Sequence, residues 1–232
     1  MFMKPSHDRL SGTADPFQDP MMKQRTSQIL YQYWNDVRGE RLAPDRFEIE
    51  PAQISTILPE TCMIQRGDDG QLAFRLAGTR VCDNLGRELR GTELQSVFLE
   101  ADRLAVESIV QTVTDQGAVG LLEFEMASED GRAVRFEMIL LPLTHMEKGI
   151  TRFLGAVSAI DPPAWMGSVK LATRGLVGHS IMWPDGRPHA LIERAKRQSP
   201  FLAVMANARV VRSDRRQFRV FDGGLLSRPT DK

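Results

Sequence analysis

The side chains that could carry out chemistry in this chain include two cysteines, four histidines and a group of arginines near the C-terminus. Thiols and imidazoles bind transition metals when they occur at paired spacings such as Cys-x-x-Cys. Cys62 and Cys82 lie twenty positions apart with no histidine close by. We therefore predict two ordinary thiols, with neither a zinc site nor a disulfide.

The histidines are equally isolated. His7 and His179 lie in expected loops, His189 begins an expected helix, and His145 follows an expected strand. None has a second potential ligand at a metal-binding spacing, so the sequence predicts no metal site.

The arginines near the C-terminus are the strongest charge feature of the chain. Arg212 and Arg216, and likewise Arg215 and Arg219, follow an Arg-x-x-x-Arg spacing. Paired guanidinium groups suit phosphates, and this spacing resembles the arginine motif of PilZ-type cyclic-dinucleotide receptors. The Asp/Asn-x-Ser-x-x-Gly run of that motif is missing. These four arginines are thus a candidate anion site. We favour a solvated basic strand, or a contact with the acidic core of the same chain, and do not expect nucleic-acid binding.

Composition and charge describe an ordinary globular chain of 232 residues, 42% of them hydrophobic and 26% charged. Residues 1–160 carry a net charge of −7 and residues 161–232 a net charge of +7.

No apolar run is long enough for a membrane span or a signal peptide, so we expect a cytoplasmic protein without a membrane partner. The common motifs of phosphate loops, hydrolase elbows and metalloproteases are absent, and we expect no enzyme.

The chain begins with residues 1–21, whose scattered prolines predict a flexible lead-in. A helix should follow over 22–38 and end near Gly39. Its apolar residues share one stripe and include aromatics, which dominate interfaces. We predict a homodimer interface at Ile29, Tyr33, Trp34 and Val37. Packing of this stripe on the chain's own sheet is equally compatible with the spacing.

Alternating hydrophobicity and turn residues predict five strands, at 60–66, 71–77, 119–127, 132–143 and 151–160. Short helices should fill 79–99, and a longer helix should span 100–116 with Leu104, Val106, Ile109, Val110 and Val113 on its buried side.

Four charged residues fall on the polar phase of these strands, where cross-strand ion pairs on a solvated face are expected: Arg75, Glu125, Arg135 and Glu137.

Glycines and prolines after Ile160 indicate that the sheet ends there. We expect residues 161–232 to form a linker and a basic C-terminal extension. This extension should hold a short helix at 189–197 and two strands, 200–211 and 217–221.

Several motifs in the same order carry a family resemblance over residues 28–160. They are Tyr33-Trp34 with Arg38-Gly39, Ala43-Pro44-Asp45-Arg46, Phe74-Arg75-Leu76-Ala77-Gly78-Thr79, Gly86-Arg87-Glu88-Leu89-Arg90-Gly91, Leu140-Leu141-Pro142-Leu143 and Arg152-Phe153-Leu154-Gly155-Ala156. The chain resembles a PAS domain, and more closely a PAS family found mainly in alphaproteobacteria. The resemblance implies an α+β PAS fold over residues 22–160. Five antiparallel strands in the order 2-1-5-4-3 would carry helices on one face, joined by an N-terminal cap helix and a C-terminal extension.

The resemblance implies a shape but no particular ligand. A pocket between the sheet and the helices of 79–99 would be lined by Leu72, Phe74, Leu76, Thr79, Arg80, Asn84, Phe136 and Met138. The alternative is that the apolar members simply fill the core. Haem is disfavoured because no histidine faces this pocket. Flavin is disfavoured because Cys82 does not lie in the Asn-Cys-Arg-Phe run of flavin photosensors.

We therefore expect a cytoplasmic regulator in signal transduction that senses a small ligand or docks a regulatory protein partner. A ligand-free interaction adaptor is the first alternative. A cyclic-dinucleotide response through the C-terminal arginines is the second.

Overall fold

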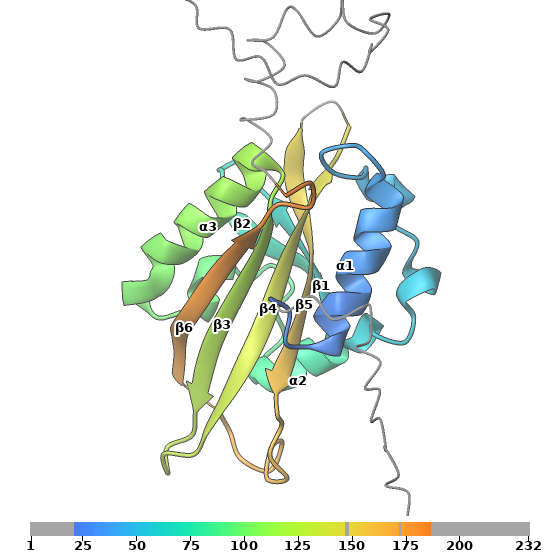
Figure 1. Ribbon diagram of the computed structural model, residues 1–232. Coiled ribbons are helices and arrows are strands. Elements are labelled where there is room, and N and C mark those ends of the chain that lie inside the picture. Colours follow the sequence, from blue (N-terminus) through green and yellow to red (C-terminus); the bar gives the residue numbers. More distant parts are fainter. Residues whose placement is uncertain (1–20, 147–148, 172, 187–232) are drawn as a thin grey trace, which may run out of the picture. The chain divides into compact units, whose positions relative to one another are not determined.

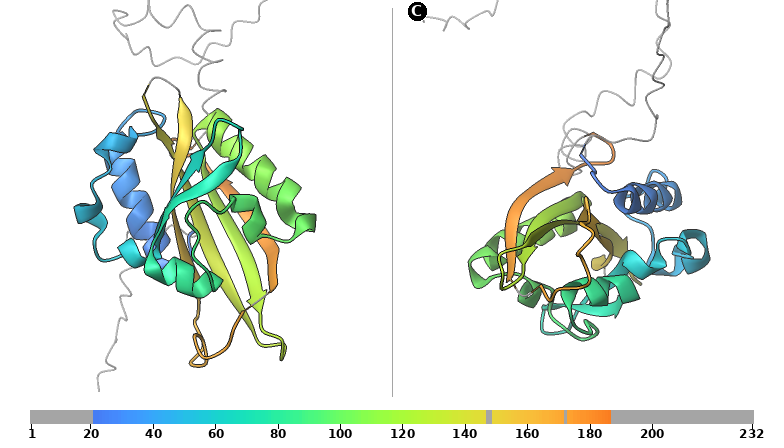
Figure 2. Two further views of the ribbon diagram at one scale, coloured as in Figure 1. Left: turned by 180° about the vertical axis from the view of Figure 1, so that it is seen from behind. Right: turned by 90° about the horizontal axis from the view of Figure 1, so that it is seen from below.

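A long apolar run in the fourth strand decides how the sheet is covered. The computed structural model describes residues 21–146, 149–171 and 173–186, and in it strand β4 spans Ala133–Thr144. Every residue from Phe136 to Leu143 is buried, so neither face of the sheet can be left to solvent there. Helices accordingly pack against both faces (Figure 2).

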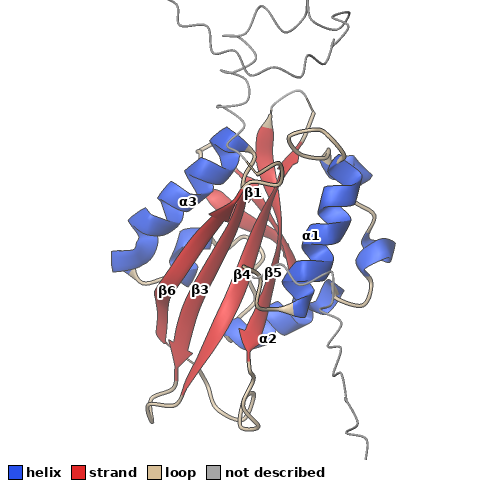
Figure 3. Ribbon diagram, in the orientation of Figure 1, coloured by secondary structure: helices blue, strands red, loops and turns tan. Residues whose placement is uncertain are grey.

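Six antiparallel strands form the sheet, in the order β2-β1-β5-β4-β3-β6 (Figures 1 and 3). Besides β4 they are β1 (Thr61–Arg66), β2 (Leu72–Ala77), β3 (Val119–Ala127), β5 (Ile150–Ile160) and β6 (Thr173–Met182). The order of the first five confirms the expected topology. Their expected ends lie within one residue of the observed ones, because strand alternation and turn residues both marked them.

Strand β6 corrects the expectation of a linker directly after Ile160. It pairs with the free edge of β3 along its whole length. Its register shifts at a bulge between the pairs Glu123↔Gly178 and Phe124↔Leu176. Glycines in a strand often mark such bulges, and in sequence they are easily taken for linker residues. His179, expected in a loop, lies in this strand.

The inner face of the sheet, as we call it, is covered by α2 (Thr79–Leu85), α3 (Arg103–Gln116) and the short 3₁₀ helices η4 (Leu94–Val97) and η5 (Glu100–Asp102). The predicted buried stripe of α3 is found, except that Leu104 is 78% exposed. Leu104 precedes Val106 by two positions, and residues so spaced do not share a helix face.

The outer face is covered by α1 (Arg25–Arg38), η1 (Arg46–Glu48), η2 (Pro51–Ile54) and η3 (Leu58–Glu60). Four α1 residues are buried at helical spacing: Ser27, Leu30, Trp34 and Arg38. Trp34 donates its indole N–H to the carbonyl of Pro142 in β4 at 2.8 Å. In the described part of the chain, no helix combines the length and apolar character needed to cross a bilayer.

A buried carboxylate fixes where α1 begins. Glu137 in β4 is 1% exposed, and its two oxygens accept the backbone N–H groups of Lys23 and Gln24 at 2.7 and 3.0 Å. Free N–H groups at a helix start favour a negative charge. Glu137 was expected in a surface ion pair, and its burial under α1 corrects that expectation. The pair Glu125–Arg135 is present at the surface, at 3.5 Å.

A second charge joins the end of α1 to the end of β6. Arg38 is 4% exposed, lies over the Trp34 ring at 5.5 Å, and donates to Asp185 at 2.8 Å. It also donates to the Asn35 side chain and the Arg41 carbonyl. This guanidinium is buried but well supplied with acceptors, as a buried charge must be.

We predict that Glu137→Ala lowers the free energy of unfolding by about 2–4 kcal/mol, because it leaves two backbone donors without their charged acceptor. Urea denaturation followed by circular dichroism measures this change. Glu125→Ala on the neighbouring strand removes only an exposed pair and should cost less than about 1 kcal/mol. Equal losses in the two variants would contradict the role assigned to Glu137.

Candidate functional site

The space between the sheet and the inner-face helices, where the sequence predicts a ligand pocket, is filled by side chains. Phe74, Phe136 and Met138 are at most 1% exposed, and Leu72 is 9% exposed. Phe136 stacks on Phe124 with ring centroids 5.4 Å apart. A hollow of about 150 Å³ beside Leu72 is smaller than the roughly 300–1,000 Å³ of usual ligand pockets. These four residues therefore form core here, as the alternative interpretation held.

Leu76 does not belong to this interior, which corrects its assignment to the pocket. It is 52% exposed. The pairing of β1 with β2 shifts between Met63↔Leu76 and Ile64↔Phe74, so Arg75 is an extra residue. A bulge of this kind reverses the alternation of side chains beyond it. The regular spacing of Leu72, Phe74 and Leu76 in sequence concealed the bulge.

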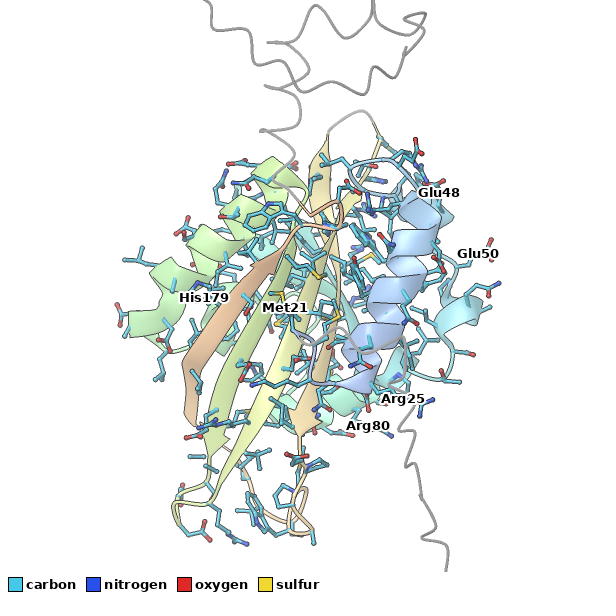
Figure 4. All side chains as sticks on the ribbon, in the orientation of Figure 1. Met21, Arg25, Glu48, Glu50, Arg80 and His179 are labelled. Atoms are coloured by element: carbon cyan, nitrogen blue, oxygen red, sulfur yellow. The ribbon has the colours of Figure 1, made fainter. Side chains whose placement is uncertain are left out.

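A cleft of about 840 Å³ opens outside the core, between the first turn of α1, helix α2 and the connection from β5 to β6. Its volume lies within the range of small-molecule sites. Figure 4 labels two of its cations, Arg25 on α1 and Arg80 on α2, both near the start of α1. Polar side chains that line it include Arg25, Thr26, Glu60, Arg80, Asn84 and Ser158.

Glu60 is the centre of the polar contacts in this cleft. Its carboxylate accepts hydrogen bonds from Thr26 of α1, from Arg80 of α2 and, at 3.1 Å, from Ser158 of β5. Burial raises the pKa of Glu60, but these hydrogen bonds and the Arg80 charge outweigh it and hold the pKa below its ordinary value. One carboxylate thereby ties together three elements that are far apart in sequence.

Gly78 places α2 against this carboxylate. Its N–H donates to the Thr61 carbonyl at 2.8 Å. A Cβ atom built there would lie 2.4 Å from the carbonyl oxygens of Leu58 and Pro59. Only glycine permits so close an approach of two backbones. Gly78 of the Phe74–Thr79 motif therefore allows α2 to lie close to η3, which brings Arg80 to Glu60.

The cleft is suited to holding a polar ligand or an extended peptide. Arg80 is 61% exposed on its side chain although it binds Glu60, so part of its guanidinium faces solvent. Asp83, Asn84 and Lys170 add further donors and acceptors at the rim. Apolar contact comes from Met166 and the neighbouring prolines.

The sequence did not predict this cleft, although two of the residues that it placed at the rim of an interior pocket line it. Arg80 and Asn84 belong to it, and Thr79 is exposed at the start of α2. Glu60 and Ser158 were missed, because Glu60 is a single polar residue directly before β1, Ser158 is a single polar residue within β5, and only the fold brings them together. A carboxylate directly before a buried strand was the available signal.

The two cysteines lie apart from this chemistry. Cys62 is buried in the core, and burial raises its pKa to about 12, so the thiol stays protonated. Partial burial is also the main cause that raises the pKa of Cys82. Among the described residues, no group of three or more histidine, cysteine, aspartate and glutamate side chains is arranged to hold a metal ion.

One of the α1 residues predicted to form a dimer interface packs against the chain's own sheet instead. Trp34 is completely buried and bonded to Pro142, which corrects its assignment to a dimer interface. Ile29, Tyr33 and Val37 are only partly buried and pack against the apolar cluster on the outer face of the sheet. For these three, the interface stays a prediction.

The candidate anion site at Arg212, Arg215, Arg216 and Arg219 lies outside the described residues. The same holds for His7, His189, residues 1–20 of the expected lead-in, and the elements expected at 189–197, 200–211 and 217–221.

Comparison with known proteins gives one family. The family model for the PAS domain matches residues 22–158. No curated protein matches the chain.

Three solved structures are similar to the chain at low identity. The PAS domain of a protein from Colwellia psychrerythraea is 15% identical with a TM-score of 0.35, over 47% of this chain and 95% of that one. The Rhodobacter sphaeroides LOV protein is 9% identical with a TM-score of 0.37, over 50% and 71%. An RNA-binding light-oxygen-voltage receptor is 12% identical with a TM-score of 0.30, over 60% and 35%.

The lowered pKa of Glu60 predicts a dependence of stability on pH. The stabilisation is complete above pH 4.5, the ordinary pKa, and is lost as the pH falls through the lower pKa of the folded state. Glu60→Gln should cost about 1–3 kcal/mol at neutral pH and lose less stability than the unchanged protein between about pH 6 and pH 3. Urea unfolding at several pH values measures both effects. Glu107→Gln, an exposed carboxylate on α3, should reproduce the unchanged curve; a parallel shift of both variants would contradict the assignment.

Proposed function

The chain belongs to the PAS domain family, a family of signal-sensing and interaction modules, and we propose that it is a regulatory protein that senses a small polar ligand in the Glu60 cleft. The observation that carries this proposal is the contrast between two spaces. The interior is packed, whereas the cleft is large enough for a ligand and is lined by polar groups from α1, η3, α2 and β5.

The contacts of Glu60 supply a route for the signal. A ligand that competes for Arg80 or Thr26 would change the hydrogen bonds that hold the first turn of α1 against the core. Helix α1 also carries the partly buried residues Ile29, Tyr33 and Val37. Ligand binding and the presentation of this helix face to a partner are therefore linked, as regulation requires.

Several finer properties belong to the same proposal. The aromatic and aliphatic residues on α1 support a homodimer or a regulatory protein partner. The ordered motifs from Tyr33 to Ala156 support a bacterial, alphaproteobacterial member of the family. The absence of recognisable catalytic motifs in the sequence supports a role without catalysis, and its composition supports a cytoplasmic location.

A ligand-free interaction adaptor is the second candidate, and the packed interior favours it specifically. In that case the cleft would receive a segment of a partner protein instead of a metabolite. A response to cyclic dinucleotides through Arg212, Arg215, Arg216 and Arg219 is a third and less favoured possibility, because half of the motif is missing.

We expect native mass spectrometry of the full chain, purified gently from its own host, to show a dimer carrying a small-molecule mass. Adding the identified compound back at about one hundred times its Kd should stabilise the fold by about 2.7 kcal/mol. Asn84→Trp, which fills the cleft with a large side chain, should abolish both effects.

Arg87→Gln is the matched control, because Arg87 follows the same helix but donates to Ser96 away from the cleft. A dimer without added mass, and without stabilisation by metabolites, would reject ligand sensing and support the adaptor. Loss of the ligand in both variants would place the site elsewhere.

A further inference from the structure

Arg152, away from the cleft, lies close enough to two arginines of other elements, Arg46 and Arg75, for their charges to act on it. Arg152 in β5 lies opposite Gln65 of β1 and Leu143 of β4 in the sheet. It is six residues along β5 from Ser158 of the cleft, or about 20 Å. The electrostatic field of both Arg46 and Arg75 acts on its guanidinium.

The backbone fixes the positions of the other two. Arg46 begins η1, and the segment before it is pinned to the end of β4, where the Thr144 N–H donates to the Pro44 carbonyl at 3.0 Å. Arg46 also reaches Met63 of β1, whose Sδ lies 2.9 Å from its Nε. Arg75 is the extra residue of the bulge in β2, which pairs with β1 on either side of it.

These guanidiniums have few acceptors. In the part of the chain that the structure describes, none of them has a carboxylate within salt-bridge distance. The contact of Arg46 is with a thioether, which is a weak acceptor. The Nε of Arg152 is buried and has no hydrogen-bond partner. Arginines elsewhere in the fold, such as Arg38, Arg80 and Arg132, do have carboxylate partners.

The nearby acid does not neutralise this cluster. Asp45 lies close enough to favour the charge on Arg152, but its carboxylate caps η1 by accepting the Phe47 N–H at 2.9 Å. Burial, followed by the charges of Arg46 and Arg75, lowers the pKa of Arg152. Like charges held together at a partly desolvated place are costly, and an anion would relieve that cost.

We propose that Arg46, Arg75 and Arg152 form a second binding site for the phosphate group of a small molecule. Guanidinium groups present paired N–H donors that match phosphate oxygens, and three of them can surround one such group. The buried N–H of Arg152 would gain the acceptor that it lacks. The site is independent of the Glu60 cleft.

Pyrophosphate is the probe, titrated into the full chain by calorimetry at constant ionic strength. We expect saturable binding and a rise in melting temperature that chloride does not produce. The double variant Arg75→Gln, Arg152→Gln should weaken binding about tenfold or more. The control Arg135→Gln removes an exposed β4 arginine paired with Glu125 and should bind as the unchanged protein does.

Two further measurements distinguish this site from the C-terminal arginines and from a purely structural role of Arg152. The C-terminal arginines must be tested because they could also bind phosphate. A chain with Arg212, Arg215, Arg216 and Arg219 all changed to Gln should still bind pyrophosphate, because the proposed site does not include them. Arg152→Gln should melt no lower than the unchanged protein when pyrophosphate is absent, because it removes repulsion. Absence of saturable binding, equal weakening in Arg135→Gln, or loss of binding in the C-terminal variant would overturn the proposal.

Discussion

The burial of β4 on both faces is the constraint on which the rest of the structure depends. A strand with apolar residues on both sides needs two covering layers, and the helices of the inner face supply one of them. Helix α1 supplies the other, and Glu137 fixes its start by taking a negative charge to two free backbone donors. The outer layer is thereby an integral part of the core, and the cleft is formed where its first turn meets α2.

Sequence patterns predicted the elements well, because local chemistry determines them. Alternation, turn residues and the helical stripe of α3 placed the strands and helices to within a few residues. The same patterns failed where long-range pairing overrides local spacing. The bulge at Arg75 turns Leu76 outward. The glycines of β6 suggested a linker, whereas in the structure this segment pairs with β3.

The candidate site was less accessible to sequence reasoning, for a physical reason. Arg80 and Asn84 could be named because α2 follows a recognisable motif, but they were assigned to the rim of an interior pocket. Glu60 owes its importance to partners 34 and 98 positions away, which no local pattern reports. The sequence could not show whether the interior holds a pocket or is packed. It gives the sizes of Phe74 and Phe136 but not the volume of the space that they occupy.

The ion pair between Arg38 and Asp185 closes the described fold into a ring, because it joins the end of its first helix to the residues beyond its last strand. A ring of this kind makes the two ends thermodynamically reciprocal. A change at one end that strengthens or weakens this ion pair therefore affects the other end, and the coupling free energy is the same in both directions. The ion pair thereby links the two ends, although its residues are 147 positions apart.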